Sequence, residues 1–390
     1  MTQRRLSRHG GLIDAVQSVV AGNKLSLHEP QFDGNEKRFL LDCIESGYVS
    51  SVGAFVSRFE EDLAKFVGAS HAVAVVNGTS GLHLALVGLG VKPGDEVFVP
   101  ALSFVATANA VALAGAVPHY VDVSEETWGV SPEGLREYLS SFARVGADGL
   151  INPRTGRPLT ALIAMHTLGF PADAEALAEV ARDFGLIFIE DAAESLGSYV
   201  GRAHTGLAGQ AGVFSFNGNK TITTGGGGAI VTSDPVLAAR LKHLSTTAKI
   251  AHRYEFDHDE VGFNYRMPNI NAALGVAQLE QLPEILERQR RLHMMYVKAL
   301  EDISSGTKAS ERLGTSSNYW LQAFLLDETA AKDKNAILNA FLDSGVAARP
   351  LWRPLNRLTP YRLSPSALTP VVDNLYARVI CLPSSPALAR

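Results

Sequence analysis

The stretch SFNGNKTITTGGGGAIV, residues 215–231, carries the most information about fold and chemistry. It places Lys220 in a turn between two apolar runs, 211–216 and 229–231, which are predicted to be neighbouring buried strands. The four glycines 225–228 have too much conformational freedom to form a helix between these two strands. A lysine held between core strands is costly to bury as a cation, which favours the free amine that forms a Schiff base.

An ordinary surface lysine is the alternative interpretation of this turn, because most loop lysines are only solvated charges. The glycine run is not a Walker phosphate loop either, since Lys220 precedes the glycines instead of following them. A catalytic role for Lys220 therefore depends on the rest of the chain.

The composition is that of a globular protein with a large core. Of 390 residues, 46% are hydrophobic and 19% are charged, and 35 Lys and Arg against 40 Asp and Glu give a net charge of -5. The chain has no surplus of basic residues that would favour binding to nucleic acid. It also has no polybasic run that would favour binding to a membrane surface. We expect neither as a partner.

The cysteines and the start of the chain indicate a cytoplasmic protein. Cys43 and Cys381 lie far apart without metal-ligand spacing, which predicts no metal site and fits a reducing compartment. The basic residues 1–9 are followed by an apolar segment that Asp14 and Gln17 interrupt, which argues against a secretory signal. No stretch reaches the roughly 18 uninterrupted apolar residues of a membrane span.

From residue 71 onwards, apolar strand patterns alternate with helical patterns. The predicted strands are near-continuous apolar runs at 71–76, 96–99, 117–123, 162–166 and 186–190. Helices between such strands imply right-handed crossovers and a mostly parallel sheet that is covered on both faces. The fold class is therefore predicted to be α/β.

Ligands bind beyond the carboxyl ends of parallel strands, and several predicted strands end at polar or aromatic side chains. Gly78, Thr79 and Ser80 open a helix after a strand, where free N–H groups and the positive helix end can hold a phosphate. A simple N-cap is the alternative. Phe104 follows the next strand, where it can stack on a flat cofactor or only fill the core.

Asp191 ends another predicted strand. Its carboxylate can cap the following segment, or it can keep a pyridine nitrogen protonated so that the ring acts as an electron sink. His166 also follows a strand, but a lone histidine there is more often structural. A phosphate cup, an aromatic face, an acid and a lysine together match one cofactor, pyridoxal 5′-phosphate, and the combination is more specific than any member.

Beyond these residues, the chain resembles the DegT/StrS-type sugar aminotransferases along nearly its whole length. The motifs that carry the resemblance are GAFVSRFE (53–60), NGTSGLHL (77–84), EDAAESLG (190–197), residues 215–228 and GFNYRM (262–267). The resemblance implies fold type I of the pyridoxal-phosphate-dependent transferases. This fold is aspartate aminotransferase-like, with a mostly parallel central sheet and a smaller C-terminal α/β domain.

Two domains are expected from the length and the change of pattern near Pro268. Residues 1–268 would form a large cofactor-binding domain with N-terminal helices. Residues 269–390 would form the small domain, including a long connecting helix at 271–302 that Pro283 kinks or breaks.

The family resemblance implies individual roles. Lys220 would bind the cofactor through a Schiff base and move a proton between the substrate carbon and C4′ of the cofactor. Asp191 would pair with the pyridine nitrogen, and Phe104 would stack on the ring. The residues that would hold the phosphate are Gly78, Thr79, Ser80 and Ser215.

The same resemblance implies a homodimer with shared active sites, because Asn264 would reach the phosphate of the neighbouring subunit. Glu194 replaces a glutamine that many relatives have near the phenolic oxygen of the cofactor. A carboxylate there would repel a phenolate unless it is protonated or bridged. Tyr265 and Arg349 are candidate substrate contacts.

A narrower similarity concerns the phrases FNGNKTITTGGGG, EDAAESLGS, ARPLW and ICLPS. They are most similar to enzymes that aminate C4 of 4-keto-6-deoxy nucleotide sugars on routes to bacillosamine and legionaminic acid. We therefore predict amination of such a sugar, bearing a 2-acetamido group, by glutamate for surface glycan synthesis. A dehydratase of the same fold, which would replace Lys220 by histidine, and a non-catalytic regulator are the alternatives.

Overall fold

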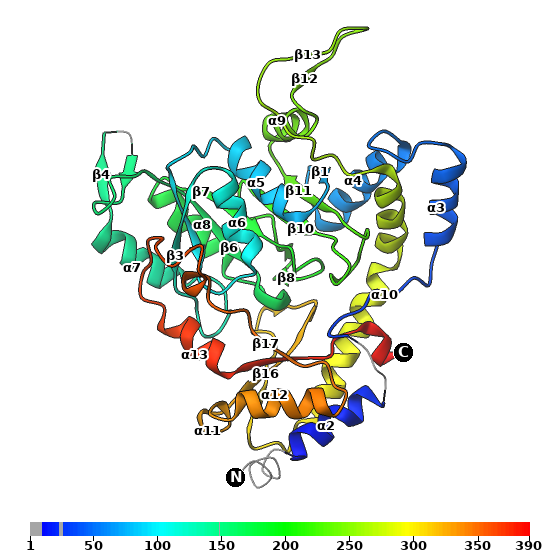
Figure 1. Ribbon diagram of the computed structural model, residues 1–390, viewed down its shortest axis with the longest axis vertical. Helices are drawn as coiled ribbons and strands as arrows, with labels where there is room; N and C mark the ends of the chain where they lie inside the picture. Colours follow the sequence, from blue (N-terminus) through cyan, green and yellow to red (C-terminus); the bar gives the residue numbers. More distant parts are fainter. Residues whose placement is uncertain (1–9, 23–25, 148) are drawn as a thin grey trace.

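The computed structural model describes residues 10–22, 26–147 and 149–390. At its centre lies a seven-stranded sheet in the order β1-β11-β10-β7-β6-β2-β3 (Figure 1). Its strands are β1 (His71–Val75), β2 (Glu96–Pro100), β3 (Val117–Val121), β6 (Leu159–Met165), β7 (Ile187–Asp191), β10 (Ala211–Ser215) and β11 (Gly228–Thr232). The strands from β10 to β3 run parallel, whereas β11 is antiparallel to β1 and β10. The predicted, mostly parallel sheet is confirmed.

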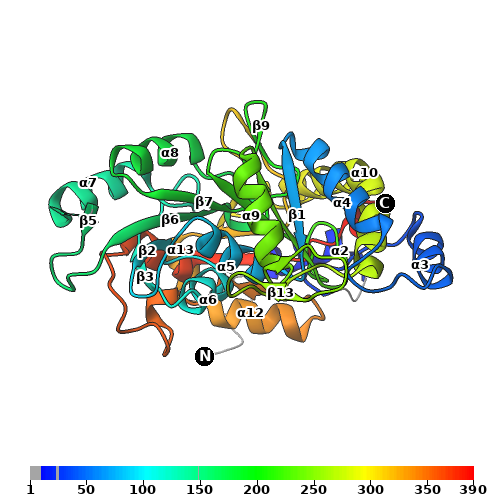
Figure 2. The same cartoon turned by 90° about the horizontal axis from the view of Figure 1, so that it is seen from above.

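Helices cover both faces of this sheet (Figure 2). The helices α7 (Pro132–Phe142) and α8 (Ala174–Asp183) pack on one face, and α5 (Gly78–Gly88), α6 (Val105–Leu113) and α9 (Pro235–Ser245) pack on the other. Successive residues of β6 show this division. Leu162 belongs to the apolar cluster that contains α7 and α8, and Ile163 belongs to the cluster that contains α5, α6 and α9. A strand that is buried on both faces needs an uninterrupted apolar run, as the sequence has.

A second, four-stranded sheet lies in the C-terminal part, in the order β14-β16-β18-β17. It consists of β14 (Gly306–Lys308), β16 (Gln322–Leu326), β17 (Arg349–Pro350) and β18 (Val379–Leu382), with helices α11 (Glu328–Ala331), α12 (Lys334–Asp343) and α13 (Pro370–Arg378). Leu12 and Val16 of α2 (Gly10–Val20) belong to the same apolar cluster as Phe324 and Ile380 of this sheet. The domain boundary near residue 268 stays a prediction.

The long helix α10 (Asn269–Ala299) links the two sheets and runs without interruption through Pro283. The predicted break is therefore wrong. Leu282 and Ile285, on either side of the proline, are buried in one apolar cluster with α4 (Ala54–Val67). This packing outweighs the backbone hydrogen bond that proline removes.

None of the helices in the described ranges combines the length and the apolarity that crossing a bilayer requires. The inference about a secretory signal depends in part on residues 1–9, which lie outside these ranges.

Close packing of α10 against α4 gives a test of the fold. A Cβ atom at Gly275 would lie 2.6 Å from Cε2 of Phe59 and 2.8 Å from Cγ2 of Thr224. We expect Gly275→Ala to lower the free energy of unfolding by about 1–3 kcal/mol through overpacking, measured as a fall in Tm. Gly10→Ala is the matched control, because that helical glycine has open space around it. An unchanged Tm for Gly275→Ala would contradict the close packing.

Candidate active site

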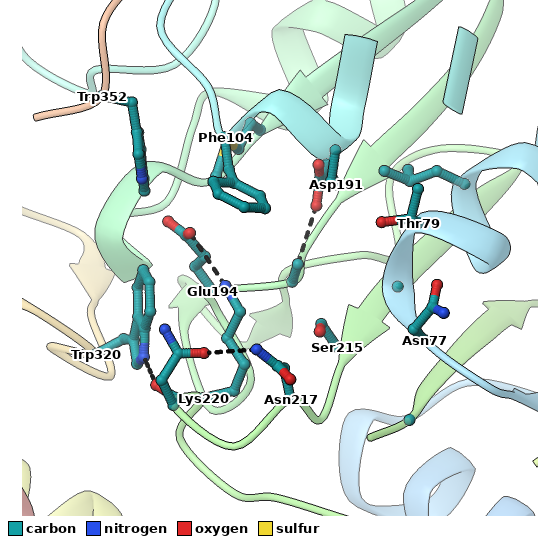
Figure 3. Close-up of a pocket in the computed structure, with 17 residues that line it drawn as sticks. Asn77, Thr79, Phe104, Asp191, Glu194, Ser215, Asn217, Lys220, Trp320 and Trp352 are labelled. Carbon is teal, nitrogen blue, oxygen red and sulfur yellow. Dashed lines mark hydrogen bonds and ion pairs between the residues drawn. The ribbon is translucent and has the colours of Figure 1, made fainter. Parts of the chain in front are cut away.

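A cavity of about 210 Å³ lies at the carboxyl ends of the parallel strands (Figure 3). Its walls come from the start of α5, the end of β7, the lysine turn after β10 and two tryptophans of the C-terminal part. The structure brings most of the predicted site residues together here: Gly78, Thr79, Phe104, Asp191, Glu194, Ser215 and Lys220.

Four predicted site residues do not line this cavity: Ser80, Asn264, Tyr265 and Arg349. Ser80 is buried in the first turn of α5, where its backbone N–H donates to Oδ1 of Asn77 at 2.8 Å. Asn264 and Arg349 are exposed. The predicted cofactor or substrate contacts of these residues stay predictions.

The start of α5 forms the anion-binding end of the cavity. Asn77 caps the helix, and the backbone N–H groups of Gly78 and Thr79 follow at positions that have no acceptor within the helix. A Cβ atom at Gly78 would lie 3.0 Å from Cβ of Ser215, so glycine lets the Ser215 hydroxyl approach the helix start. These donors at the positive helix end have the chemistry that a phosphate needs.

Asp191 lies at the end of β7 with a buried carboxylate. Its Oδ2 accepts a hydrogen bond from Oγ1 of Thr107 at 2.7 Å, and its Oδ1 accepts one from the backbone N–H of Ala193 at 3.2 Å. Burial raises the pKa of Asp191, although these bonds favour the carboxylate. Asp191 thus also caps the local turn, and a protonated ring nitrogen in the cavity would offset the cost of its buried charge.

Lys220 and Glu194 form an ion pair in the cavity. The Lys220 Nζ lies 3.1 Å from Oε1 of Glu194, and Oε2 of Glu194 accepts a hydrogen bond from the backbone N–H of Leu168 at 2.9 Å. Burial raises the pKa of Glu194 to about 7, against the opposing effect of Lys220. The raised pKa and the contact with Lys220 both favour a carboxyl group that tolerates a nearby phenolic oxygen, and the contact of Glu194 with the cofactor stays a prediction.

Aromatic side chains form another part of the wall, and two of them were not predicted as site residues. Trp352 lies beside Phe104, with ring centroids 6.4 Å apart, and Phe104 keeps 49% of its surface exposed. Trp320 lies against Lys220. The sequence carries no local signal for the two tryptophans, because both are far along the chain from the strand ends that they meet.

His166 is structural in this arrangement. It is buried outside the cavity, where its Nε2 lies 2.9 Å from Oε2 of Glu190 and its Nδ1 accepts a hydrogen bond from the backbone N–H of Ala172.

Comparison with known proteins gives consistent matches. The sequence pattern of the DegT/DnrJ/EryC1/StrS aminotransferase family matches residues 30–390. The chain is 34% identical over 365 residues to GDP-perosamine synthase of Vibrio cholerae, covering 93% of this chain and 95% of that protein. It is 36% identical to EpsN of Bacillus subtilis, whose name classes it as a pyridoxal phosphate-dependent aminotransferase, with coverage of 93% and 91%.

Among solved structures, Helicobacter pylori PseC, an aminotransferase involved in pseudoaminic acid biosynthesis, matches with a TM-score of 0.84. The sequence identity is 25%, and the match covers 93% of this chain and 94% of that one.

The raised pKa of Glu194 predicts a pH-dependent stability. Between pH 4.5, the ordinary pKa, and about 7, the folded protein binds more protons at Glu194 than the unfolded chain does. Protonation of Glu194 therefore stabilises the fold at low pH, and this contribution is lost as the pH rises through the folded pKa of about 7. Glu194→Gln removes this titration. In protein without cofactor, we expect the variant to gain up to ~3 kcal/mol relative to wild type between pH 5 and pH 8, measured as a growing difference in Tm.

Glu287→Gln, which replaces an exposed carboxylate on α10, serves as the control and should show no such trend. A difference between Glu194→Gln and wild type that stays constant across this pH range would contradict the assignment.

Proposed function

The chain belongs to the DegT/DnrJ/EryC1/StrS aminotransferase family, and we propose that it transfers the amino group of glutamate to C4 of a nucleotide-linked 4-keto-6-deoxy sugar. The matches confirm an aminotransferase of fold type I with pyridoxal 5′-phosphate as its cofactor. They favour neither a dehydratase nor a non-catalytic regulator, and Lys220 and Asp191 are both retained.

One observation supports this function above the others: the start of α5, Asp191 and Lys220 all face one cavity. Gly78, Thr79 and Ser215 would hold the phosphate group of the cofactor, Asp191 its ring nitrogen and Phe104 a face of the ring. When bound, pyridoxal phosphate supplies an electron sink for the electrons left at carbon when a proton is removed.

Lys220 is the base that this chemistry needs. Its amine can take the proton from Cα of glutamate and, in the second half of the reaction, deliver a proton to C4 of the sugar. Glu194 lies within hydrogen-bonding distance of this amine, and because burial raises its pKa, it can exchange a proton with Lys220.

The substrate assignment rests on chemistry and resemblance. A ketone can accept an amine, and a nucleotide diphosphate offers charge and a base through which binding energy can align the reacting carbon. The motif similarity favours a 2-acetamido sugar, whereas the matched Vibrio cholerae protein is named for a GDP-linked sugar. The new amino sugar would serve surface glycan synthesis.

A substrate panel tests this proposal. The enzyme is incubated with glutamate and with UDP-2-acetamido-2,6-dideoxy-4-hexulose, or with GDP- or dTDP-linked 4-keto-6-deoxy sugars, and the amino sugar is detected by mass. We expect product with the UDP sugar and, for Lys220→Ala, a loss of turnover of at least about 1,000-fold because the proton-transferring group is gone. Activity on small 2-oxo acids alone, with no 4-ketosugar accepted, would reject the assignment.

Two copies of the chain are proposed to form the working enzyme. Leu41, Ile44 and Tyr48, on and just after α3 (Glu36–Glu45), are exposed apolar side chains, and so is Phe256 in the hairpin of β12 (Lys249–Ile250) and β13 (Asp257–His258). This hairpin projects from the body of the molecule (Figure 1). Such apolar groups are typical of protein interfaces, and a second copy would bring Asn264 to the neighbouring cavity.

Mixing of inactive variants tests the shared site. Lys220→Ala and Asn264→Ala, each inactive alone, should regain up to about a quarter of wild-type activity when mixed, because a random hybrid dimer contains one intact site. Subunit exchange is confirmed by native mass spectrometry. Proven exchange without recovered activity would place Asn264 in the site of its own subunit.

A further inference from the structure

We propose that Trp320 is a positioning residue that holds the amine of Lys220 in place; the inference rests on the proposed role of Lys220. Trp320 is 3% exposed and lies just before β16, in the C-terminal part of the chain. The Lys220 Nζ lies 4.0 Å from the centroid of its ring (Figure 3). A cation over an indole face is attracted by the negative face of the ring.

The same indole also holds the backbone of the lysine turn. Its Nε1–H donates a hydrogen bond to the carbonyl oxygen of Asn219 at 2.7 Å. Trp320 therefore contacts both the tip of the Lys220 side chain and the peptide before it. With Oε1 of Glu194 at 3.1 Å, the ammonium group lies between an aromatic face and a carboxylate, which restricts where it can point.

A buried amide fixes Trp320 relative to the cavity. The Asn318 side chain, which is 2% exposed, accepts a hydrogen bond from the backbone N–H of Trp320 at 2.9 Å. Its NH₂ group donates to the carbonyl oxygen of Glu194 at 2.9 Å and to Oγ1 of Thr221 at 3.1 Å. One amide thus links Trp320 to the backbone of Glu194 and to Thr221, which follows Lys220, and a satisfied buried network of this kind is rigid.

The backbone between these two residues is strained. Tyr319 has φ of +49°, in the left-handed region that non-glycine residues rarely adopt. Its ring is buried and stacked on His293, with centroids 3.8 Å apart and an interplanar angle of 10°. Strain that the surrounding packing maintains is common at functional sites. Here it accompanies the contacts of both Asn318 and Trp320 with the lysine turn.

A purely structural role for Trp320 would have a different consequence. If the indole only filled space, its loss would weaken every property of the cavity together. If it positions Lys220, its loss should impair bond formation by the amine and leave the noncovalent binding of cofactor intact. The two roles are therefore separable by measuring binding and bond formation independently.

The experiment compares Trp320→Phe and Trp320→Leu with wild type, each prepared without cofactor. Pyridoxal phosphate is added, the bond to lysine is reduced with borohydride at timed intervals, and the modified lysine is identified by peptide mass. Affinity for pyridoxamine 5′-phosphate, which has an amine in place of the aldehyde and cannot bond to lysine, gives the noncovalent binding.

We expect capture by Lys220 to slow about 10- to 100-fold in Trp320→Leu and by less in Trp320→Phe, which keeps a ring face, because misplaced groups react slowly. Pyridoxamine phosphate affinity should stay within about threefold of wild type, since the phosphate and ring contacts remain. Trp128→Phe is the matched control, because Trp128 is also buried, with 6% of its surface exposed, but lies outside the cavity, and both properties should be unchanged.

Unchanged capture in both Trp320 variants would overturn the proposal. Equal losses of capture and of pyridoxamine phosphate affinity would overturn it too, since they would mark Trp320 as a space-filling residue. If Trp320→Leu does not fold, Trp320→Phe carries the test alone. Capture by a lysine other than Lys220 in the wild type would instead contradict the proposed function on which the inference rests.

Discussion

Charged groups are buried at the carboxyl edge of the central sheet, and the surrounding residues have to compensate for their lost hydration. Asp191 and Glu194 are both nearly fully buried, and burial raises the pKa of each carboxyl group. Such groups stay charged only where hydrogen bonds or cations compensate the lost hydration. Thr107, Ala193 and Lys220 provide part of this compensation, and a bound cofactor with a protonated nitrogen would provide more.

The topology of the sheet explains how these groups meet. The strands β1, β10 and β7 end at one edge, so residues after β1 and after β7 line the same cavity although they are far apart in sequence. The antiparallel strand β11 returns the chain at this edge, and a Cβ atom at Gly228 would lie 2.5 Å from the backbone carbon of Asn77. The glycine thus lets the lysine turn lie against the helix start that offers the anion site.

The C-terminal part completes the cavity instead of only flanking it. Trp320 and Trp352 come from this part. Asn318, also from this part, donates hydrogen bonds to the carbonyl oxygen of Glu194 and to Oγ1 of Thr221. Asp122, at the end of β3, accepts hydrogen bonds from the first N–H groups of α13, at Val371 and Val372. The C-terminal part is therefore joined to the large sheet by polar contacts of Asn318 beside the ion pair and of Asp122 at the sheet edge. A change in its position would move the walls of the cavity.

Local features of this protein could be predicted from its amino-acid sequence. Apolar runs separated by helical patterns fixed the α/β class, because a strand buried on both faces must be apolar throughout. Gly78, Asp191 and Lys220 could be identified because each stands at a strand end or a few residues after one, where the chemistry of the residue and its place coincide. The continuity of α10 through Pro283 could not, because it depends on the burial of Leu282 and Ile285 and outweighs the local preference of proline.

The distant residues that complete the site become evident in the folded structure. Trp320 carries no pattern that connects it with Lys220, and the partners of Asn318 lie in other segments of the chain. The pKa of Glu194 likewise depends on burial and on Lys220, not on neighbours in sequence. Hydration and packing are properties of the folded surroundings, so a linear sequence specifies these contacts only through the fold that it adopts.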